Sequence, residues 1–195
     1  YAEFAKIAPN ISYVIDTDLG AGPDPARGAA HIAALTSNHL WPIISGIEIG
    51  NECDLFSGNG HRNSTYGFTQ YEAEFAQYLA AYKKAGLPEQ RIQGAAFCCF
   101  KPDFDAGLKG YVRKYAADLA TLSYHSYSGS HCGTSKVTPT QMLSNISSSG
   151  RAEKYSFVVA DAAAANVPFV IGEGNSVACG GMPVRQALGM WSVGP

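Results

Sequence analysis

The sequence predicts an α/β protein, a (β/α)8 TIM barrel that is present as an incomplete barrel with about strands three to seven. Short strand-like runs alternate with amphipathic helical segments of about 12 to 17 residues, which is typical of parallel βα units. No glycine-rich phosphate loop follows any of these runs, and this disfavours an open nucleotide-binding sheet. Candidate catalytic residues instead follow the carboxyl ends of several different strands, which is where barrel enzymes have their catalytic residues.

Local patterns place the elements in order along the chain. Asp24 is a favourable N-cap, and Pro25 suits the first turn of the helix that it begins. Thr69, with Glu72 three residues later, has the capping-box spacing for a second helix, which Gly86 ends. The predicted elements are a strand at 12–17, a helix at 24–37, a strand at 43–49, a helix at 69–85, a strand at 91–97, a helix at 105–120, a strand at 121–126, helical stretches at 140–145 and 150–165, and a strand at 167–171.

The length limits how much of a barrel the chain contains. A full eight-stranded barrel typically needs about 250 residues, whereas this chain has 195. No linker, low-complexity tract or internal repeat divides it. We therefore expect one partial barrel domain over residues 1–195, without the first strands and the last strand of a full barrel.

The composition argues against two classes of partner. Hydrophobic residues make up 46% and charged residues 15% of the chain, as in a folded globular domain. The net charge is -2 and no run of lysine or arginine occurs, so we expect no nucleic acid partner and no membrane surface. No apolar stretch approaches the roughly 20 residues of a membrane span.

Three acceptor triplets favour a secreted, extracellular protein. Asn10, Asn63 and Asn145 each stand in an Asn-X-Ser/Thr triplet, and we expect N-glycans on them. Such triplets also arise by chance in a chain rich in serine and asparagine.

The five cysteines match no zinc or redox motif. Cys98 and Cys99 stand in a strand-like stretch, where successive side chains face opposite ways, so no bond between them is expected. We expect them to be small buried hydrophobic residues instead. Cys132 and Cys179 stand in glycine-rich loops and would form a disulfide if those loops meet.

Two glutamates follow short apolar runs that are typical of buried strands. Glu52 follows the run at 47–51, and Glu173 follows the run at 168–172. Retaining glycoside hydrolysis needs two such carboxyl groups about 5 Å apart, one as proton donor and one as nucleophile. Asn51, beside Glu52, would hydrogen-bond the sugar hydroxyl next to the reacting carbon. The alternative is a pair of solvated carboxylates at strand ends.

A tyrosine and a histidine end the strand between the two glutamates. The hydroxyl of Tyr127 would donate to the nucleophile and keep it ionised. His125 would contact the acid or the sugar, and its alternative role is that of a satisfied core histidine.

Three segments carry a family pattern: IEIGNECDLF at 47–56, YHSY at 124–127 and GEGNSVACGG at 172–181. Together they resemble glycoside hydrolase family 79, the β-glucuronidase and heparanase-like enzymes, particularly the fungal and bacterial β-glucuronidases. The resemblance implies a barrel of the retaining-glycosidase clan, with a C-terminal β-domain that is missing here. It also implies that Glu52 is the acid/base, that Glu173 is the nucleophile, and that Asn51, Tyr127 and Asn175 contact sugar.

The chain departs from the family pattern in two places. The segment at 182–195 loses the expected pattern, and Cys53 stands where the family often has proline. The exposed thiol expected there would lie close to the acid/base position.

The expected function is therefore that of an exo-β-glucuronidase that cleaves terminal β-glucuronides by double displacement, at acidic pH and without a metal or organic cofactor. Glucuronic-acid-containing glycans or glycosides are the expected substrates. Three alternatives stay open: another retaining β-glycosidase, an endo-acting heparanase-like enzyme, and a truncated fragment without activity.

Overall fold

The computed structural model describes residues 2–142 and 152–181, in which one parallel sheet curls into half a barrel. Its strands follow one another in the order β1-β2-β3-β4-β5, each parallel to the next. Their bounds are β1 Tyr13–Thr17, β2 Ile44–Ile49, β3 Ile92–Phe97, β4 Leu119–Ser130 and β5 Phe169–Ala178. This arrangement is consistent with the incomplete (β/α)8 barrel that the sequence predicts. The numbering of the strands as third to seventh stays a prediction.

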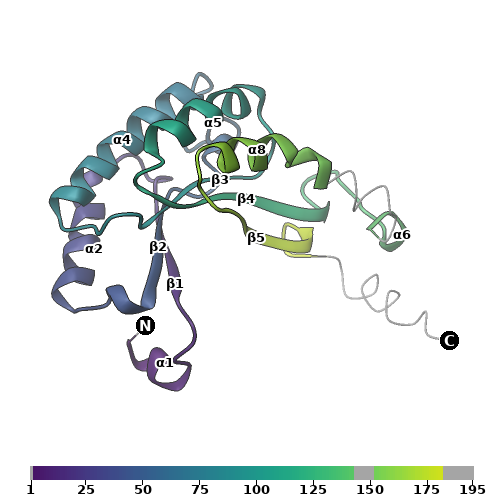
Figure 1. Ribbon diagram of the computed structural model, residues 1–195. Helices are drawn as coiled ribbons and strands as arrows, with labels where there is room; N and C mark the ends of the chain where they lie inside the picture. Colours follow the sequence, from purple (N-terminus) through teal and green to yellow (C-terminus); the bar gives the residue numbers. More distant parts are fainter. Residues whose placement is uncertain (1, 143–151, 182–195) are drawn as a thin grey trace.

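Four longer helices lie on the outer, convex side of the sheet (Figure 1). They are α2 Pro25–Ser37, α4 Phe68–Lys84, α5 Pro102–Tyr115 and α8 Ser156–Ala164. The shorter helical elements are α1 Ala2–Ile7, which precedes β1, and η1 Trp41–Ile43, η2 Cys53–Leu55, α3 Phe56–Asn59 and α6 Pro139–Met142, which lie in the connections between the strands and the longer helices. A helix after each of several parallel strands is the βα repeat expected from the sequence.

Aromatic side chains fill the space between these helices and the sheet. On α4 the buried residues recur every three or four positions, as a helix with one apolar face requires. The ring of Tyr71 lies 4.9 Å from that of Phe97 on β3, and the ring of Phe75 lies 4.9 Å from that of Tyr111 on α5. These contacts hold the carboxyl end of β3 in a fixed place beside the helices.

The concave side of the sheet is polar. Ile47 and Ile49 belong to the apolar core under the helices. Glu48, between them on the strand, therefore points to the opposite face. There Gln93 Nε2 donates to Glu48 Oε2 at 2.5 Å, and Thr121 Oγ1 donates to Gln93 Oε1 at 3.3 Å. Burial raises the pKa of Glu48 despite the hydrogen bond from Gln93.

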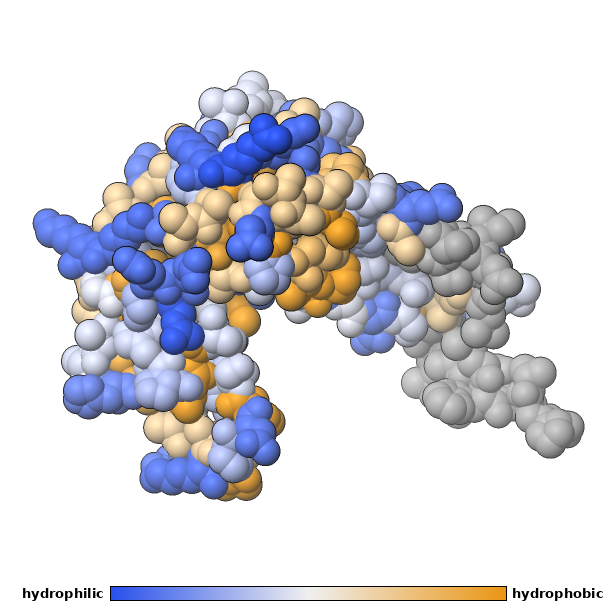
Figure 2. Space-filling model, viewed as in Figure 1, coloured by the Kyte–Doolittle hydropathy of each residue, from blue (hydrophilic) through white to orange (hydrophobic). Residues whose placement is uncertain are grey.

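The two outer strands expose apolar side chains, as expected for an open barrel. Val14 on β1 is 45% exposed and Ile171 on β5 is 47% exposed. Figure 2 shows apolar side chains on the lower arm of the molecule, where Figure 1 places α1 and β1. Phe4, Ile7 and Ile11 are also exposed in this region. No helix in the described ranges is both long and apolar enough to cross a membrane.

Several predicted boundaries were wrong. The helix expected at 105–120 runs from Pro102 to Tyr115, because the chain must enter β4 at Leu119. Strands β4 and β5 extend past the predicted ends at 126 and 171, because they pair with each other as far as Ser130 and Ala178. Helices were expected at 140–145 and 150–165, and the described parts of these segments contain α6 and α8.

The start of α4 also differs from the prediction. Gly67, not Thr69, is the N-cap, and its N–H donates to Gln70 Oε1 at 3.1 Å. Glu72 instead receives a hydrogen bond from Lys114 at 2.9 Å. Asn145 and the divergent segment at 182–195 lie outside the described residues.

Candidate active site

Side chains from β4, β5 and the turn after β2 converge at one end of the half-barrel. Glu52 follows β2, His125 and Tyr127 lie on β4, and Glu173 lies on β5. His125 is the register partner of Glu173. Glu173 therefore stands inside a strand, whereas the sequence suggested a position just beyond one.

Backbone conformation aims Glu52 into this site. Gly50 has φ +82, and a Cβ there would lie 2.5 Å from Cys53 Sγ, so only glycine fits. Glu52 itself is left-handed, with φ 50 and ψ 44, and its N–H donates to the carbonyl oxygen of Ala96 at 3.0 Å. Non-glycine residues adopt this conformation at a cost of about 1–3 kcal/mol, and such residues cluster at functional sites.

His125 connects the two glutamates. Its Nδ1 lies 3.0 Å from Glu52 Oε1 and 3.6 Å from Glu173 Oε2. Burial alone would lower the pKa of His125, but the hydrogen bond with Glu52 and the negative charges of Glu173, Glu52 and Glu48 outweigh it, so the pKa is raised. The hydroxyl of Tyr155 donates to the carbonyl oxygen of His125 at 2.8 Å and fixes this part of β4.

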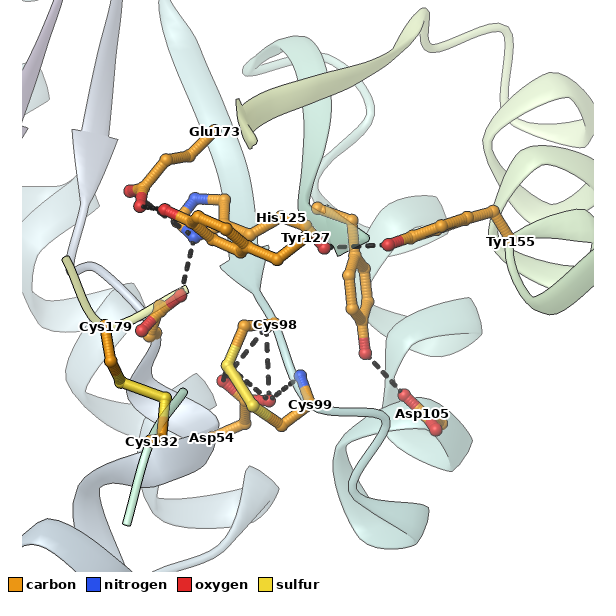
Figure 3. Close-up of a disulfide and its surroundings, with 12 residues drawn as sticks. Asp54, Cys98, Cys99, Asp105, His125, Tyr127, Cys132, Tyr155, Glu173 and Cys179 are labelled. Carbon is orange, nitrogen blue, oxygen red and sulfur yellow. Dashed lines mark hydrogen bonds and ion pairs between the residues drawn. A yellow bond between two sulfur atoms is a disulfide. The ribbon is translucent and has the colours of Figure 1, made fainter. Parts of the chain in front are cut away.

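Tyr127 donates its hydroxyl proton to Glu173 Oε1 (Figure 3). This hydrogen bond, with some desolvation and the charge of Glu173, raises the pKa of Tyr127 to about 12. The side chain of Glu52 is 26% exposed and that of Glu173 is 47% exposed, so a ligand can reach both. A carboxylate oxygen of Glu52, a ring nitrogen of His125 and a carboxylate oxygen of Glu173 lie within 4.8 Å of one another.

The glutamates open into a pocket of about 950 Å³. This is large enough for a sugar, since ligand pockets commonly span about 300–1,000 Å³. Lys136 and Lys154 also line it, and both are exposed. The remaining residues of the wall include Leu55, Phe100, Tyr155 and four cysteines.

The prediction for Cys98 and Cys99 was wrong, because these neighbours form a disulfide. β3 ends at Phe97, so both cysteines lie beyond the strand, where its side-chain alternation no longer applies. The disulfide between Cys132 and Cys179 is present as expected. Cys53 is a free thiol and fully buried, so it is not exposed near the acid/base position; desolvation raises its pKa.

The structure brings four of the six predicted site residues together: Glu52, His125, Tyr127 and Glu173. Asn51 and Asn175 are exposed and are not among the described residues that line the pocket. The Oδ1 atom of Asn175 accepts from the N–H of Ser176 at 2.7 Å.

Sequence reasoning missed other residues of the pocket. Among the missed residues are Cys98, Cys99, Lys136, Lys154 and Tyr155. For Cys98 and Cys99 a signal existed, since they follow the carboxyl end of a strand just as Glu52 does. The lysines come from segments outside the sheet, and no strand-end rule finds them.

Two clusters in the described ranges place possible metal ligands close together. Asp54 lies with Cys98 and Cys99, but these sulfurs are bonded to each other and offer no thiolate. Glu52, His125 and Glu173 form the other cluster, with nitrogen and oxygen donors of the kind that zinc accepts. The same three groups suit acid–base and nucleophilic chemistry.

Comparisons with known proteins agree with the fold. No protein-family model matches the sequence, and no curated protein sequence matches it. A solved structure is similar: a 4-O-α-L-rhamnosyl-β-D-glucuronidase from Fusarium oxysporum 12S, in complex with Rha-GlcA. The TM-score is 0.73 at 22% identity, over 92% of this chain.

This likeness establishes a glucuronidase-like fold for the chain. It covers 39% of the Fusarium chain, so the present chain spans about two fifths of that length. A shared fold does not determine the reaction, which depends on the residues of the site.

Proposed function

We propose that this chain carries the catalytic pair of a retaining β-glucuronidase of glycoside hydrolase family 79. The observation that carries the proposal is the approach of Glu52 and Glu173, with carboxylate oxygens within 4.8 Å of each other across one pocket. Retaining glycosidases hold their carboxyl groups about 5–5.5 Å apart, whereas inverting enzymes need about 6.5–9.5 Å to admit a water between them.

The two glutamates take different roles because their neighbours differ. Tyr127 donates a hydrogen bond to Glu173 and helps to hold it in place, which suits the nucleophile that attacks the anomeric carbon. Glu52 gives its proton to the departing oxygen as the glycosidic bond breaks, leaving a glycosyl ester on Glu173. Glu52 then takes a proton from the water that cleaves this ester. His125, 3.0 Å from Glu52, stabilises the negative charge that Glu52 acquires in the first step.

Two lysines favour an anionic sugar. The carboxylates around the pocket would repel the carboxylate of a glucuronide, and Lys136 and Lys154 supply opposite charge on the pocket wall. In this proposal Asn51 and Asn175 contact the sugar once it is bound. The enzyme acts on terminal β-glucuronides. In this proposal it is secreted or extracellular and carries N-glycans on Asn10, Asn63 and Asn145. The barrel strands would be the third to seventh, accompanied in the family by a C-terminal β-domain.

A panel of nitrophenyl β-glycosides tests the proposal. The chain should hydrolyse the glucuronide faster than the glucoside, xyloside or galactoside, and Glu52→Gln and Glu173→Gln should each abolish the reaction. Faster hydrolysis of a neutral glycoside would reject the substrate in favour of another retaining β-glycosidase. Near-normal activity of either glutamine variant would reject the assigned roles.

A charge-matched pair of variants tests the substrate preference alone. Lys154→Gln should raise KM for the glucuronide and leave KM for its uncharged methyl ester unchanged. Lys84→Gln, an exposed charge removed from α4, should change neither. Equal effects of the two variants would show that Lys154 does not recognise the uronate.

A further inference from the structure

The Cys98–Cys99 disulfide forms part of the pocket wall on the same side as Glu52. β3 ends at Phe97, directly before Cys98. The carbonyl oxygen of Ala96, also on β3, accepts a hydrogen bond from the N–H of Glu52 at 3.0 Å. The turn that carries Glu52 is therefore hydrogen-bonded to the end of β3, two residues before the disulfide. Tyr127 and Glu173 come from β4 and β5, further along the sheet.

Asp54 fixes the disulfide against the Glu52 turn. Its buried carboxylate accepts the N–H of Cys99 at 2.8 Å and the N–H of Cys98 at 3.3 Å (Figure 3). Burial raises the pKa of Asp54, although both hydrogen bonds favour its charged form. Because Asp54 stands two residues after Glu52, one short segment positions both the glutamate and the disulfide.

The disulfide offers an apolar contact surface in the pocket, together with its chain neighbour Phe100 and with Leu55. Cys98 is half-buried and Cys99 is exposed. Asp54 therefore holds the disulfide through the backbone, while the disulfide faces the pocket. Sulfur is polarisable and makes favourable contacts with ring faces and edges. A bridge between adjacent residues has little freedom to lose when a ligand binds, and preorganised surfaces bind better for this reason.

We propose that the Cys98–Cys99 disulfide is the contact surface for the leaving group, and that it selects leaving groups that present a ring. This inference rests on the proposed function, in which Glu52 protonates the departing oxygen. The leaving group must then lie on the Glu52 side of the pocket, where the disulfide is. Both a pyranose ring and an aryl ring offer the apolar face or edge that such a surface fits.

The test compares leaving groups with and without a ring. kcat/KM is measured for methyl β-glucuronide, p-nitrophenyl β-glucuronide and a glucuronyl disaccharide. Cys98→Ser combined with Cys99→Ser should lower kcat/KM about two- to tenfold more for the two ring-bearing substrates than for the methyl glucuronide. Cys132→Ser combined with Cys179→Ser removes the other disulfide of the pocket and should leave this ratio unchanged. An unchanged ratio in the Cys98/Cys99 variant would overturn the proposal.

A second experiment covers the case in which the double variant does not fold. In the Cys132→Ser/Cys179→Ser protein, Cys98–Cys99 is the one disulfide left, and a phosphine reduces it reversibly. Reduction should lower the preference for ring-bearing leaving groups, and reoxidation should restore it. Alkylation of Cys98 and Cys99 in protein that was never reduced, detected by peptide mass spectrometry, would overturn the proposal.

A measurement of ligand binding, which needs no hydrolysis, tests the disulfide contact independently of the proposed function. If the chain hydrolyses no glucuronide, the proposed function fails, and saturation-transfer NMR of the same ligands still tests the disulfide. Transfer to the aryl protons of p-nitrophenyl β-glucuronide should be strong in the native chain and weak in the Cys98/Cys99 variant. Equal transfer in both proteins would reject the disulfide as a contact surface.

Discussion

Tyr127→Phe removes one hydroxyl from the site and should isolate its contribution to catalysis. The hydroxyl donates to Glu173 Oε1, and a hydrogen bond to a charged group contributes about 1.5–3 kcal/mol. Because the Glu173 side chain is 47% exposed, water replaces part of the lost interaction, and the lower end of that range applies. A loss of about 1.5 kcal/mol corresponds to a decrease of about tenfold in kcat/KM.

The assay is steady-state hydrolysis of p-nitrophenyl β-glucuronide at several pH values. Tyr66→Phe is the matched control, because Tyr66 also donates to a glutamate, Glu74, but does so away from the pocket. The control should lose stability and keep its kcat/KM. NMR titration of labelled tyrosine should find the pKa of Tyr127 at about 12, and Glu173→Gln should return it toward about 10. Unchanged kcat/KM in Tyr127→Phe, or an unshifted Tyr127 pKa, would refute the reasoning.

Three further predictions concern stability and cofactors. The raised pKa of His125 contributes stability that is fully present below the ordinary histidine pKa of about 6.5 and is lost as pH rises through the higher folded value. Urea unfolding of His125→Gln should lose this pH dependence, and a slope equal to that of the native chain would contradict it. Gly50→Ala should destabilise the fold by about 1–3 kcal/mol, whereas Gly22→Ala, at φ +104 with open surroundings, should cost only about 1 kcal/mol. Equal losses of stability in the two variants would show that the contact with Cys53 is not the cause of the destabilisation in Gly50→Ala. Dialysis against EDTA should leave glucuronide hydrolysis unchanged, and a loss that zinc restores would assign Glu52, His125 and Glu173 to a metal.

The parallel sheet was predictable because its strands carry their own signals. Runs such as Ile44–Ile49 are short and rich in isoleucine, and helix α4 has distinct polar and apolar faces. Where two strands pair with each other the limits were not predictable, since the partner and not the local sequence sets the end. For that reason β5 runs on through Glu173 to Ala178.

The glutamate pair was predictable for a related reason. Both residues stand where parallel strands deliver their side chains to one end of a barrel, so spacing and strand context were enough to bring them together. The contact of His125 with Glu173 depends on the register between β4 and β5, which no local pattern encodes. The Cys98–Cys99 disulfide was missed because strand alternation was extended two residues too far, past the end of β3 at Phe97.

In the proposed reaction, Glu52 and Glu173 hydrolyse a β-glucuronide by double displacement. Proton NMR of the hydrolysis of p-nitrophenyl β-glucuronide tests it most directly, because it detects which anomer of glucuronic acid forms first. Double displacement retains the configuration, so we expect the β anomer first, followed by slow mutarotation, and no product from Glu173→Gln. Initial release of the α anomer, or product formed at a normal rate by Glu173→Gln, would contradict it.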